Sequence, residues 1–132
     1  MQGEMKLDTL LAGMSPALAP EVYVFATRPD GTWPKDLTPR MIFHESEGTT
    51  LIVTQSQARA AGIAHHFPCR MITLNVHSAL EAVGFIARIA SELAAQGMGV
   101  NPVAGFFHDH LFVPADRADE AMAILTSLTS RG

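Results

Sequence analysis

The chain has 132 residues, of which 48% are hydrophobic and 17% are charged, and its formal net charge at pH 7 is −4. This composition can bury a core in one domain, or in two small motifs that share a core. Without a block of basic residues the chain lacks the charge pattern of a nucleic-acid-binding protein, and no apolar run reaches the ~18–20 residues that cross a bilayer.

The single cysteine, Cys69, rules out a disulfide framework within the chain and favours a reducing compartment. The N-terminal segment carries Glu4 and Asp8, and it has no apolar stretch long enough for a signal peptide. We therefore expect a cytoplasmic protein that neither crosses a membrane nor binds nucleic acid.

The first half of the chain alternates strand signals with turn signals. β-branched and aromatic residues predict strands, and a Pro-Asp-Gly and a Ser-Glu-Gly segment predict a loop and a hairpin turn between them. A short helix ends at Gly62, which is placed as a C-cap. The predicted elements are a helix at Lys6–Met14, strands at Glu21–Thr27, Arg40–Glu45 and Thr49–Thr54, and a helix at Gln55–Ala61.

The second half is predicted to form a complete βαββα unit. Its long helix is expected to begin at Ser78, because Ser78 and Glu81 have the spacing of a capping box, and to end at Gly97. Gly84 lies early in this helix, where glycine costs roughly 1 kcal/mol relative to alanine, so we expect another backbone or a ligand close to it. Pro102 cannot donate to a strand ladder, which predicts an edge, a bulge or an interface there. The predicted elements are a strand at Arg70–Val76, the helix, strands at Met98–Phe107 and His110–Val113, and a final helix from Asp116 to Leu128.

This order, with VGFIARIASELAAQGMGVNPV followed by HLFVPADRADEAMAIL, resembles the ACT domain, a small-molecule-sensing module of amino-acid metabolism. The likeness is greatest to the ACT repeats of aspartate kinases, at Val83-Gly84-Phe85, at Gly97 through Asn101 and at Phe112-Val113-Pro114. Over nearly the whole chain, LLAGMSPALAPEVYVFAT, LEAVGFIA and NPVAGFFHDHLFVP resemble a family of small bacterial proteins made of two fused ACT-like units.

The resemblance implies an α+β, ferredoxin-like fold of tandem ACT-type βαββαβ sandwiches, with an antiparallel sheet and the helices on one face. It implies a degenerate N-terminal unit at residues 1–66 and a complete C-terminal unit at residues 67–132, packed as one body. Such units pair side by side, and an unpaired sheet leaves an edge strand open. We therefore expect a homodimer or a higher homo-oligomer.

The resemblance also implies a ligand site between the turn before the long helix and the strand after it. Helix N-termini bind carboxylates, and a small residue there permits close approach, so the site suits a small molecule such as an amino acid. This chain departs from the usual ACT turn, which has an acidic residue and a proline just before the glycine, because it reads Glu81-Ala82-Val83-Gly84. The predicted ligand-binding residues are His77, Ser78, Val83, Gly84, Phe85, Asn101, Pro102 and Val103.

Two histidine clusters suggest a metal site as an alternative. On extended backbone, His108 and His110 would point to one face and could share a metal ion. A tight turn with Asp109 between two strands is the more ordinary interpretation, and zinc or nickel usually takes three or four protein ligands. The segment His65-His66-x-x-Cys69 is either a source of further ligands or a solvated connector.

Signatures of common enzyme classes are absent from the sequence: it has no G-x-S-x-G elbow, no P-loop, no dinucleotide fingerprint and no H-E-x-x-H. We therefore predict a non-catalytic regulatory protein of ACT type that needs no cofactor and binds a small molecule through paired ACT units. The alternatives are a metal-binding sensor that uses the His108-Asp109-His110 turn, and a purely structural or partner-binding assembly protein.

Overall fold

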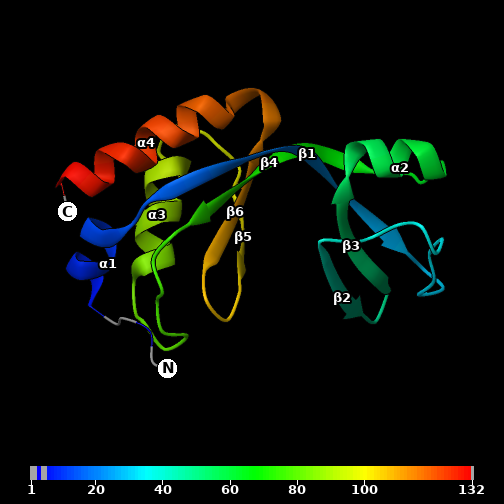
Figure 1. Cartoon of the computed structure of the whole chain (residues 1–132), viewed down its shortest axis with the longest axis horizontal. Helices are drawn as coiled ribbons and strands as arrows, with labels where there is room; N and C mark the ends of the chain where they lie inside the picture. The colour runs from blue at the N-terminus through cyan, green and yellow to red at the C-terminus, as the bar shows by residue number, and fades with distance from the viewer. Residues whose placement is uncertain (1–2, 4–5, 132) are drawn as a thin grey trace. The chain divides into compact units, whose positions relative to one another are not determined.

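The computed structural model describes residue 3 and residues 6–131 of the chain, and Figure 1 shows its helices and strands. In chain order the elements are α1 (Leu7–Gly13), β1 (Pro16–Arg28), β2 (Met41–Glu45), β3 (Gly48–Thr54), α2 (Gln55–Ala61), β4 (His66–Leu74), α3 (Phe85–Ala94), β5 (Asn101–Ala104), β6 (Asp109–Pro114), a 3-10 turn η1 (Ala115–Arg117) and α4 (Ala118–Arg131). Hydrogen-bonded neighbours among the strands follow the order β2-β3-β1-β4-β6-β5.

The chain divides into two compact units. The α3 unit, as we name it, holds the residues up to Pro20 and those from Arg70 onward, and the α2 unit is Glu21–Cys69. The division falls inside β1 and inside β4, so each of these strands contributes one part to each unit. The predicted boundaries of the two sequence repeats, residues 1–66 and 67–132, stay a prediction, because compact units are defined by contacts in space and repeats by order along the chain. The compact units differ from them because the first twenty residues join the C-terminal half.

The α3 unit has a ferredoxin-like topology. Its first strand comes from β4, which is followed by α3, β5, β6 and α4, and residues 16–20 of β1 supply the fourth strand beside β4. The Arg70 guanidinium ties these two strands together, because its Nε and Nη2 atoms donate to the Ala19 carbonyl oxygen at 2.9 and 2.8 Å. The N-terminal part of the chain therefore completes the sheet of the C-terminal half.

The core of the α3 unit lies between its sheet and its helices. Figure 1 shows α1, α3 and α4 gathered on one side of β4 and β6. Each layer contributes fully buried side chains, such as Leu10 on α1, Ile89 on α3, Leu111 on β6 and Leu125 on α4. Burial of this kind fixes α3 against the sheet, and the start of α3 is where the candidate site lies.

The α2 unit follows the same order with one element missing. Residues 21–28 of β1 form its first strand, and β2, β3, α2 and the first residues of β4 follow. Where the first helix of a βαββαβ order would lie, residues 29–40 form turns and a loop. On the covered face, Val24, Leu51 and Val53 pack with Ala58 of α2, and Trp33 of the loop lies against this cluster.

Several short-range predictions are confirmed. Helix α2 has the predicted bounds, and Gly62 follows it in the left-handed conformation with φ +66°. The predicted hairpin is formed by β2 and β3, which pair antiparallel with Glu45 opposite Gly48. Pro102 lies on β5, the last strand in the sheet order, so its missing N–H falls at an edge, as predicted.

The long helix is shorter than predicted, because α3 begins at Phe85 rather than at Ser78. The capping-box prediction is wrong: the Ser78 hydroxyl donates to Oδ2 of Asp109 at 3.0 Å, and the residue that precedes α3 is Gly84, with φ +91° and ψ −11°. A positive φ at Gly84 takes the chain out of the helix there. Residues 78–84 therefore form a separate loop, and the conformation of Gly84 explains why a glycine stands at this position.

We predict that Gly84→Ala lowers the free energy of unfolding by about 1–2 kcal/mol, because a side chain at this positive φ is strained even where space exists. A Cβ at position 84 would meet no atom closer than Leu7 Cδ2 at 3.9 Å, so the loss would be conformational. Urea denaturation followed by circular dichroism measures it. The matched control is Gly99→Ala, where a Cβ meets nothing within 4 Å and the φ is ordinary, and equal losses in both variants would contradict the prediction.

Candidate functional site

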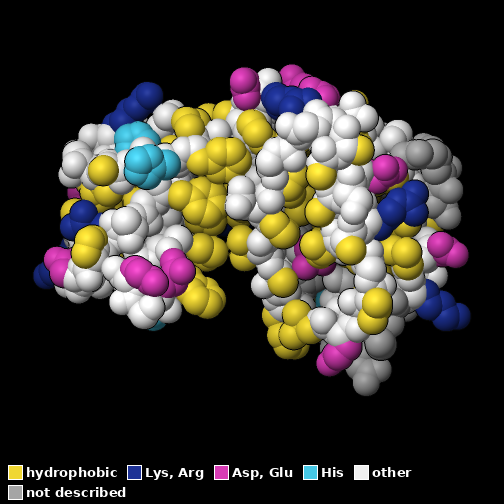
Figure 2. Space-filling model, turned by 180° about the vertical axis from the view of Figure 1, so that it is seen from behind, with side chains coloured by type: hydrophobic (Ala, Val, Ile, Leu, Met, Phe, Trp, Pro, Cys, Tyr) yellow, Lys and Arg dark blue, Asp and Glu magenta, His cyan; other side chains and the backbone are white. Residues whose placement is uncertain are grey.

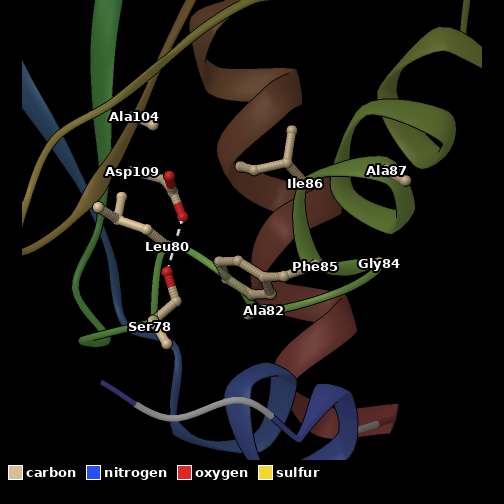
Figure 3. Close-up of a pocket in the computed structure, with 10 residues that line it drawn as sticks. Ser78, Leu80, Ala82, Gly84, Phe85, Ile86, Ala87, Ala104 and Asp109 are labelled. Atoms are coloured by element: carbon tan, nitrogen blue, oxygen red, sulfur yellow. Dashed lines mark hydrogen bonds between the residues drawn. The ribbon is translucent and has the colours of Figure 1, made fainter. Parts of the chain in front are cut away.

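A cavity of about 190 Å³ lies in the α3 unit at the start of α3, and Figure 3 shows its lining. The walls come from the loop before α3, from the first turn of α3, from the end of β5 and from the start of β6. The lining residues are Ser78, Ala79, Leu80, Ala82, Gly84, Phe85, Ile86, Ala87, Ala104 and Asp109. Most of the lining side chains are therefore apolar, and the polar ones are one carboxylate and one hydroxyl.

The loop before α3 is held at both ends. A backbone hydrogen bond from Ala82 N to Ala79 O at 3.0 Å closes a turn within it, and the Ser78 hydroxyl fastens its beginning to β6. At its end, the Phe85 side chain is only 2% exposed and anchors the first turn of α3 in the core. The cavity is therefore bounded by backbone that is fixed by the fold.

The first turn of α3 presents open backbone N–H groups. The N–H groups of the first turn of a helix have no acceptor within the helix, and they carry the positive end of its dipole. The N-cap residue of α3 is Gly84, which has no side chain to cap the helix. Gly84, Phe85, Ile86 and Ala87, which form this end of the helix, all line the cavity. This end of the cavity is suited to an anionic group.

Asp109 and Ser78 form the polar part of the wall. Asp109 is 8% exposed and Ser78 is 9% exposed, and in Figure 3 the two side chains point toward each other, joined by the hydrogen bond from the serine hydroxyl. Within the described residues, the ion pairs are Arg88 with Glu92 and Arg117 with Glu120. None of these involves Asp109, so its carboxylate has no cationic partner in that part of the chain.

Exposed apolar side chains surround the same loop. Phe106 and Phe107, at the tip of the β5–β6 hairpin, are 64% and 56% exposed, and their rings meet edge to face with centroids 5.1 Å apart. Figure 2 shows hydrophobic side chains gathered at this tip. His77 packs on Phe107 at a centroid distance of 5.7 Å, and Leu80 is 65% exposed. The loop therefore carries an apolar outer surface as well as its share of the cavity wall.

A tight backbone turn forms that hairpin tip. Gly105 N donates to His108 O at 2.9 Å, and a Cβ on Gly105 would lie 2.9 Å from the same oxygen, which only glycine avoids. This short connection sets the register in which Ala104 is opposite Asp109. Asp109 is therefore held at the first position of β6, beside the last residue of β5.

The predicted ligand-binding residues fall into two groups. Ser78, Gly84 and Phe85 line the cavity. His77 and Val83 flank them, with Val83 82% exposed. On β5 the strand residue that lines the cavity is Ala104, whereas the predicted ones lie further from the hairpin tip, at Asn101, Pro102 and Val103. The full set of ligand contacts stays a prediction.

Sequence reasoning missed Asp109 as a cavity residue. Its position between two histidines suggested a turn residue whose side chain would bond to the nearby backbone. The side chain instead meets Ser78, which lies 31 positions earlier in the chain. A hydrogen bond across such a separation leaves no local signal, although an acidic residue at the start of an otherwise apolar strand is a hint.

In the described residues the histidine clusters do not form a metal site. His110 Nδ1 lies 3.0 Å from Thr73 Oγ1 on the neighbouring strand β4, and His65 Nδ1 lies 2.8 Å from the carbonyl oxygen of Ile63. Within the described ranges, residue 3 and residues 6–131, no group of three or more His, Cys, Asp and Glu side chains could hold a metal ion. His108 and His110 therefore have no third ligand of these types in that part of the chain.

Cys69 is buried in the α2 unit and is not exposed to solvent. Its thiol donates to the carbonyl oxygen of Tyr23 at 3.3 Å, and burial raises the pKa of the thiol from 9.0 to about 12. The thiolate is the nucleophilic form of cysteine, so near neutral pH this side chain is a poor nucleophile.

Comparison with protein families decides the classification. One ACT domain model matches residues 2–70, which is more than half of the chain, and a second ACT domain model matches residues 66–127. The chain belongs to the ACT domain family. The two matches show that an ACT repeat occurs in each half, and they confirm the tandem, ferredoxin-like fold expected from the sequence.

Solved structures support this classification. A Vibrio cholerae protein of unknown function, described as a possible transport protein, is 39% identical with a TM-score of 0.83, and the match covers 93% of this chain and 95% of that chain. A protein from Agrobacterium tumefaciens is 15% identical with a TM-score of 0.75, covering 88% and 89%. The ligand-free regulatory subunit of aspartate kinase from Thermus thermophilus is 11% identical with a TM-score of 0.66, covering 89% and 97%. The last two similarities show the shared fold.

Other comparisons are negative. Curated protein sequences give no match to the chain. In the described part of this ACT protein, no helix combines the length and the apolar character needed to cross a bilayer.

We predict that Ser78→Ala lowers the free energy of unfolding by about 1–3 kcal/mol, because it leaves the buried Asp109 carboxylate without its hydrogen-bond donor. Ser127→Ala is the matched control, since the exposed Ser127 hydroxyl donates only to Ile124 O of its own helix, and a change within about 0.5 kcal/mol is expected there. Chemical denaturation of both variants makes the comparison. A Ser78→Ala protein as stable as the Ser127→Ala protein would contradict the prediction.

We predict that Cys69 resists thiol reagents in the folded protein and contributes a loss of stability at high pH. Because the folded state holds the thiol proton more tightly, the stabilisation is complete below pH 9.0 and is lost as the pH rises toward about 12. Dithionitrobenzoate should react with the wild-type thiol only when urea unfolds the chain. Between these pH values the wild type should lose more stability than Cys69→Ala, and parallel pH profiles would refute the prediction.

Proposed function

We propose that this ACT protein is a non-catalytic regulatory protein that binds a small molecule, such as an amino acid, in the cavity at the start of α3. The observation that carries the proposal is the cavity itself, whose lining includes the start of a helix with no cap from its N-cap residue and a buried carboxylate. Its place in the fold, at the turn that precedes a helix of an ACT repeat, agrees with membership of the family. The aspartate kinase regulatory subunits share this fold at low sequence identity.

We infer that the protein works through paired units in a homodimer or a higher homo-oligomer. The outermost strands in the sheet order are β2 and β5, and sheet edges offer unpaired backbone groups to a second copy. Ile42 and Phe43 on β2 are 45% and 63% exposed, which gives that edge an apolar surface. A ligand that binds one paired state better than another would transmit a signal by shifting the equilibrium between them.

The non-catalytic part of the proposal has support in the chemistry of the side chains. The cavity lining holds one carboxylate and one hydroxyl, and these two groups bond to each other. A serine nucleophile needs a base that accepts its proton and a partner that orients the base, commonly a histidine, and no histidine lines the cavity. The arrangement is therefore better suited to holding a ligand than to transforming it.

We predict that isothermal titration of the purified full chain with the twenty L-amino acids gives saturable heat for at least one of them at millimolar concentration or below. Ala104→Leu should weaken that binding, because position 104 lines the cavity and the added atoms fill it. The matched control is Ala94→Leu, which adds the same atoms at an exposed position at the end of α3.

Light scattering with and without the bound amino acid supplies the second measurement, and we expect an oligomer whose stability changes on binding. If no amino acid gives heat, the amino-acid proposal is wrong. If one binds with equal affinity to the wild type and to Ala104→Leu, the ligand occupies another place.

A further inference from the structure

In the described part of the chain, no cationic side chain forms an ion pair with the Asp109 carboxylate. The residue is only 8% exposed and lines the cavity, and its side chain accepts a hydrogen bond from the neutral hydroxyl of Ser78. Transfer of an isolated carboxylate out of water is costly, and buried charges in proteins are normally paired. A cationic group in the cavity would supply the missing partner.

The fold keeps the Asp109 carboxylate in this place. Asp109 begins β6 and is opposite Ala104 on β5, and the hairpin between these strands is closed by the hydrogen bond from Gly105 N to His108 O. Ser78 holds the side chain from the other direction. The carboxylate is therefore positioned before any ligand arrives, and a cation would meet it without rearrangement of the backbone.

The start of α3, which favours negative charge, lines the same cavity as the Asp109 carboxylate. Helix α3 is ten residues long and its N-cap residue, Gly84, provides no side-chain cap, so the N–H groups of its first turn and the helix dipole favour an anionic group. The remaining lining side chains carry no charge, since they belong to alanines, Leu80, Phe85 and Ile86. A ligand that matches this wall has one cationic end, one anionic end and an uncharged body.

We propose that Asp109 binds the ammonium group of a zwitterionic amino acid with an uncharged side chain, whose carboxylate lies at the start of α3. This inference rests on the proposed function, because it names the ligand class of the same cavity. The cavity volume of about 190 Å³ is below the ~300–1,000 Å³ of pockets for drug-sized ligands, so the amino acid is a small one. Asp109 thereby selects amino acids over acids of the same shape that lack the amino group.

The test compares matched pairs of probes on three proteins by isothermal titration. The pairs are L-alanine with propanoate, L-valine with 3-methylbutanoate, L-serine with 3-hydroxypropanoate and L-threonine with 3-hydroxybutanoate. The proteins are the wild-type chain, Asp109→Asn and Asp119→Asn. Asparagine keeps the acceptor oxygen for Ser78 and removes the charge, and Asp119 is an exposed residue of α4 that serves as the matched control.

For at least one pair, we expect the wild type and Asp119→Asn to bind the amino acid and to bind its deaminated acid at least about tenfold more weakly. Asp109→Asn should lose about tenfold or more in affinity for that amino acid and should lose the preference over the acid. Its melting temperature without ligand should equal or exceed that of the wild type, because the unpaired buried charge is gone. A residue with a purely structural role would show the reverse, a lower melting temperature with binding retained.

Three results would overturn the role of Asp109 while leaving the proposed function standing: equal affinity of the wild type for amino acid and deaminated acid, undiminished binding by Asp109→Asn, or binding only of amino acids whose side chain is charged. An uncharged amino acid outside the four pairs is compared with its own deaminated acid in the same way. If none of the twenty binds the wild type, the proposed function fails as well. Should Asp109→Asn not fold, the paired titration of the wild type decides, because preference for the ammonium-bearing probe supports the proposal and its absence refutes it.

Discussion

The hydrogen bond between Ser78 and Asp109 is the interaction on which the candidate site depends. It joins the loop before α3 to the first residue of β6 across a long stretch of sequence, and both side chains are buried. This hydrogen bond holds Ser78 at the start of β6 rather than at the start of a helix, and the chain continues as a loop until Gly84, the residue that precedes α3. The first turn of the helix is thereby left open toward the cavity.

Strands β1 and β4 constrain how the chain can be divided, because each of them belongs to both compact units. Residues 16–20 complete the sheet of the α3 unit, and the start of β4 completes the sheet of the α2 unit. A half of the chain cut near residue 66 would lack a strand and expose unpaired backbone groups at a new edge. Two ACT repeats that share strands in this way need each other to close their sheets.

The two repeats differ in one element, the helix after the first strand. The α3 unit has a helix after its first strand, and the start of that helix forms the wall of the cavity. In the α2 unit, residues 29–40 take the place of the corresponding helix, so that repeat has no helix N-terminus in the equivalent position. The tandem therefore combines one repeat in which a cavity lies at the start of a helix with one that lacks this helix and contributes the edge strand β2.

The sequence by itself determined the features that depend on neighbouring residues. Gly62 marked the end of α2, the hairpin at Ser46-Glu47-Gly48 followed from its turn residues, and Pro102 indicated an edge because it lacks an N–H. The resemblance to ACT domains predicted a ligand site near Gly84; a cavity lies there, and its occupation by a ligand stays a prediction. Each of these signals acts within a few residues, where backbone geometry leaves few choices.

Tertiary structure alone decided which distant residues meet. The spacing of Ser78 and Glu81 favours a capping box, yet the fold places the Ser78 hydroxyl against the buried Asp109 carboxylate of β6, and the helix begins only at Phe85. Likewise, residues 16–20 carry no local sign that they complete the C-terminal sheet, because strand pairing depends on which edge is open once the rest has folded. Asp109 became a cavity residue for the same reason: its environment is made by elements that are far from it in sequence.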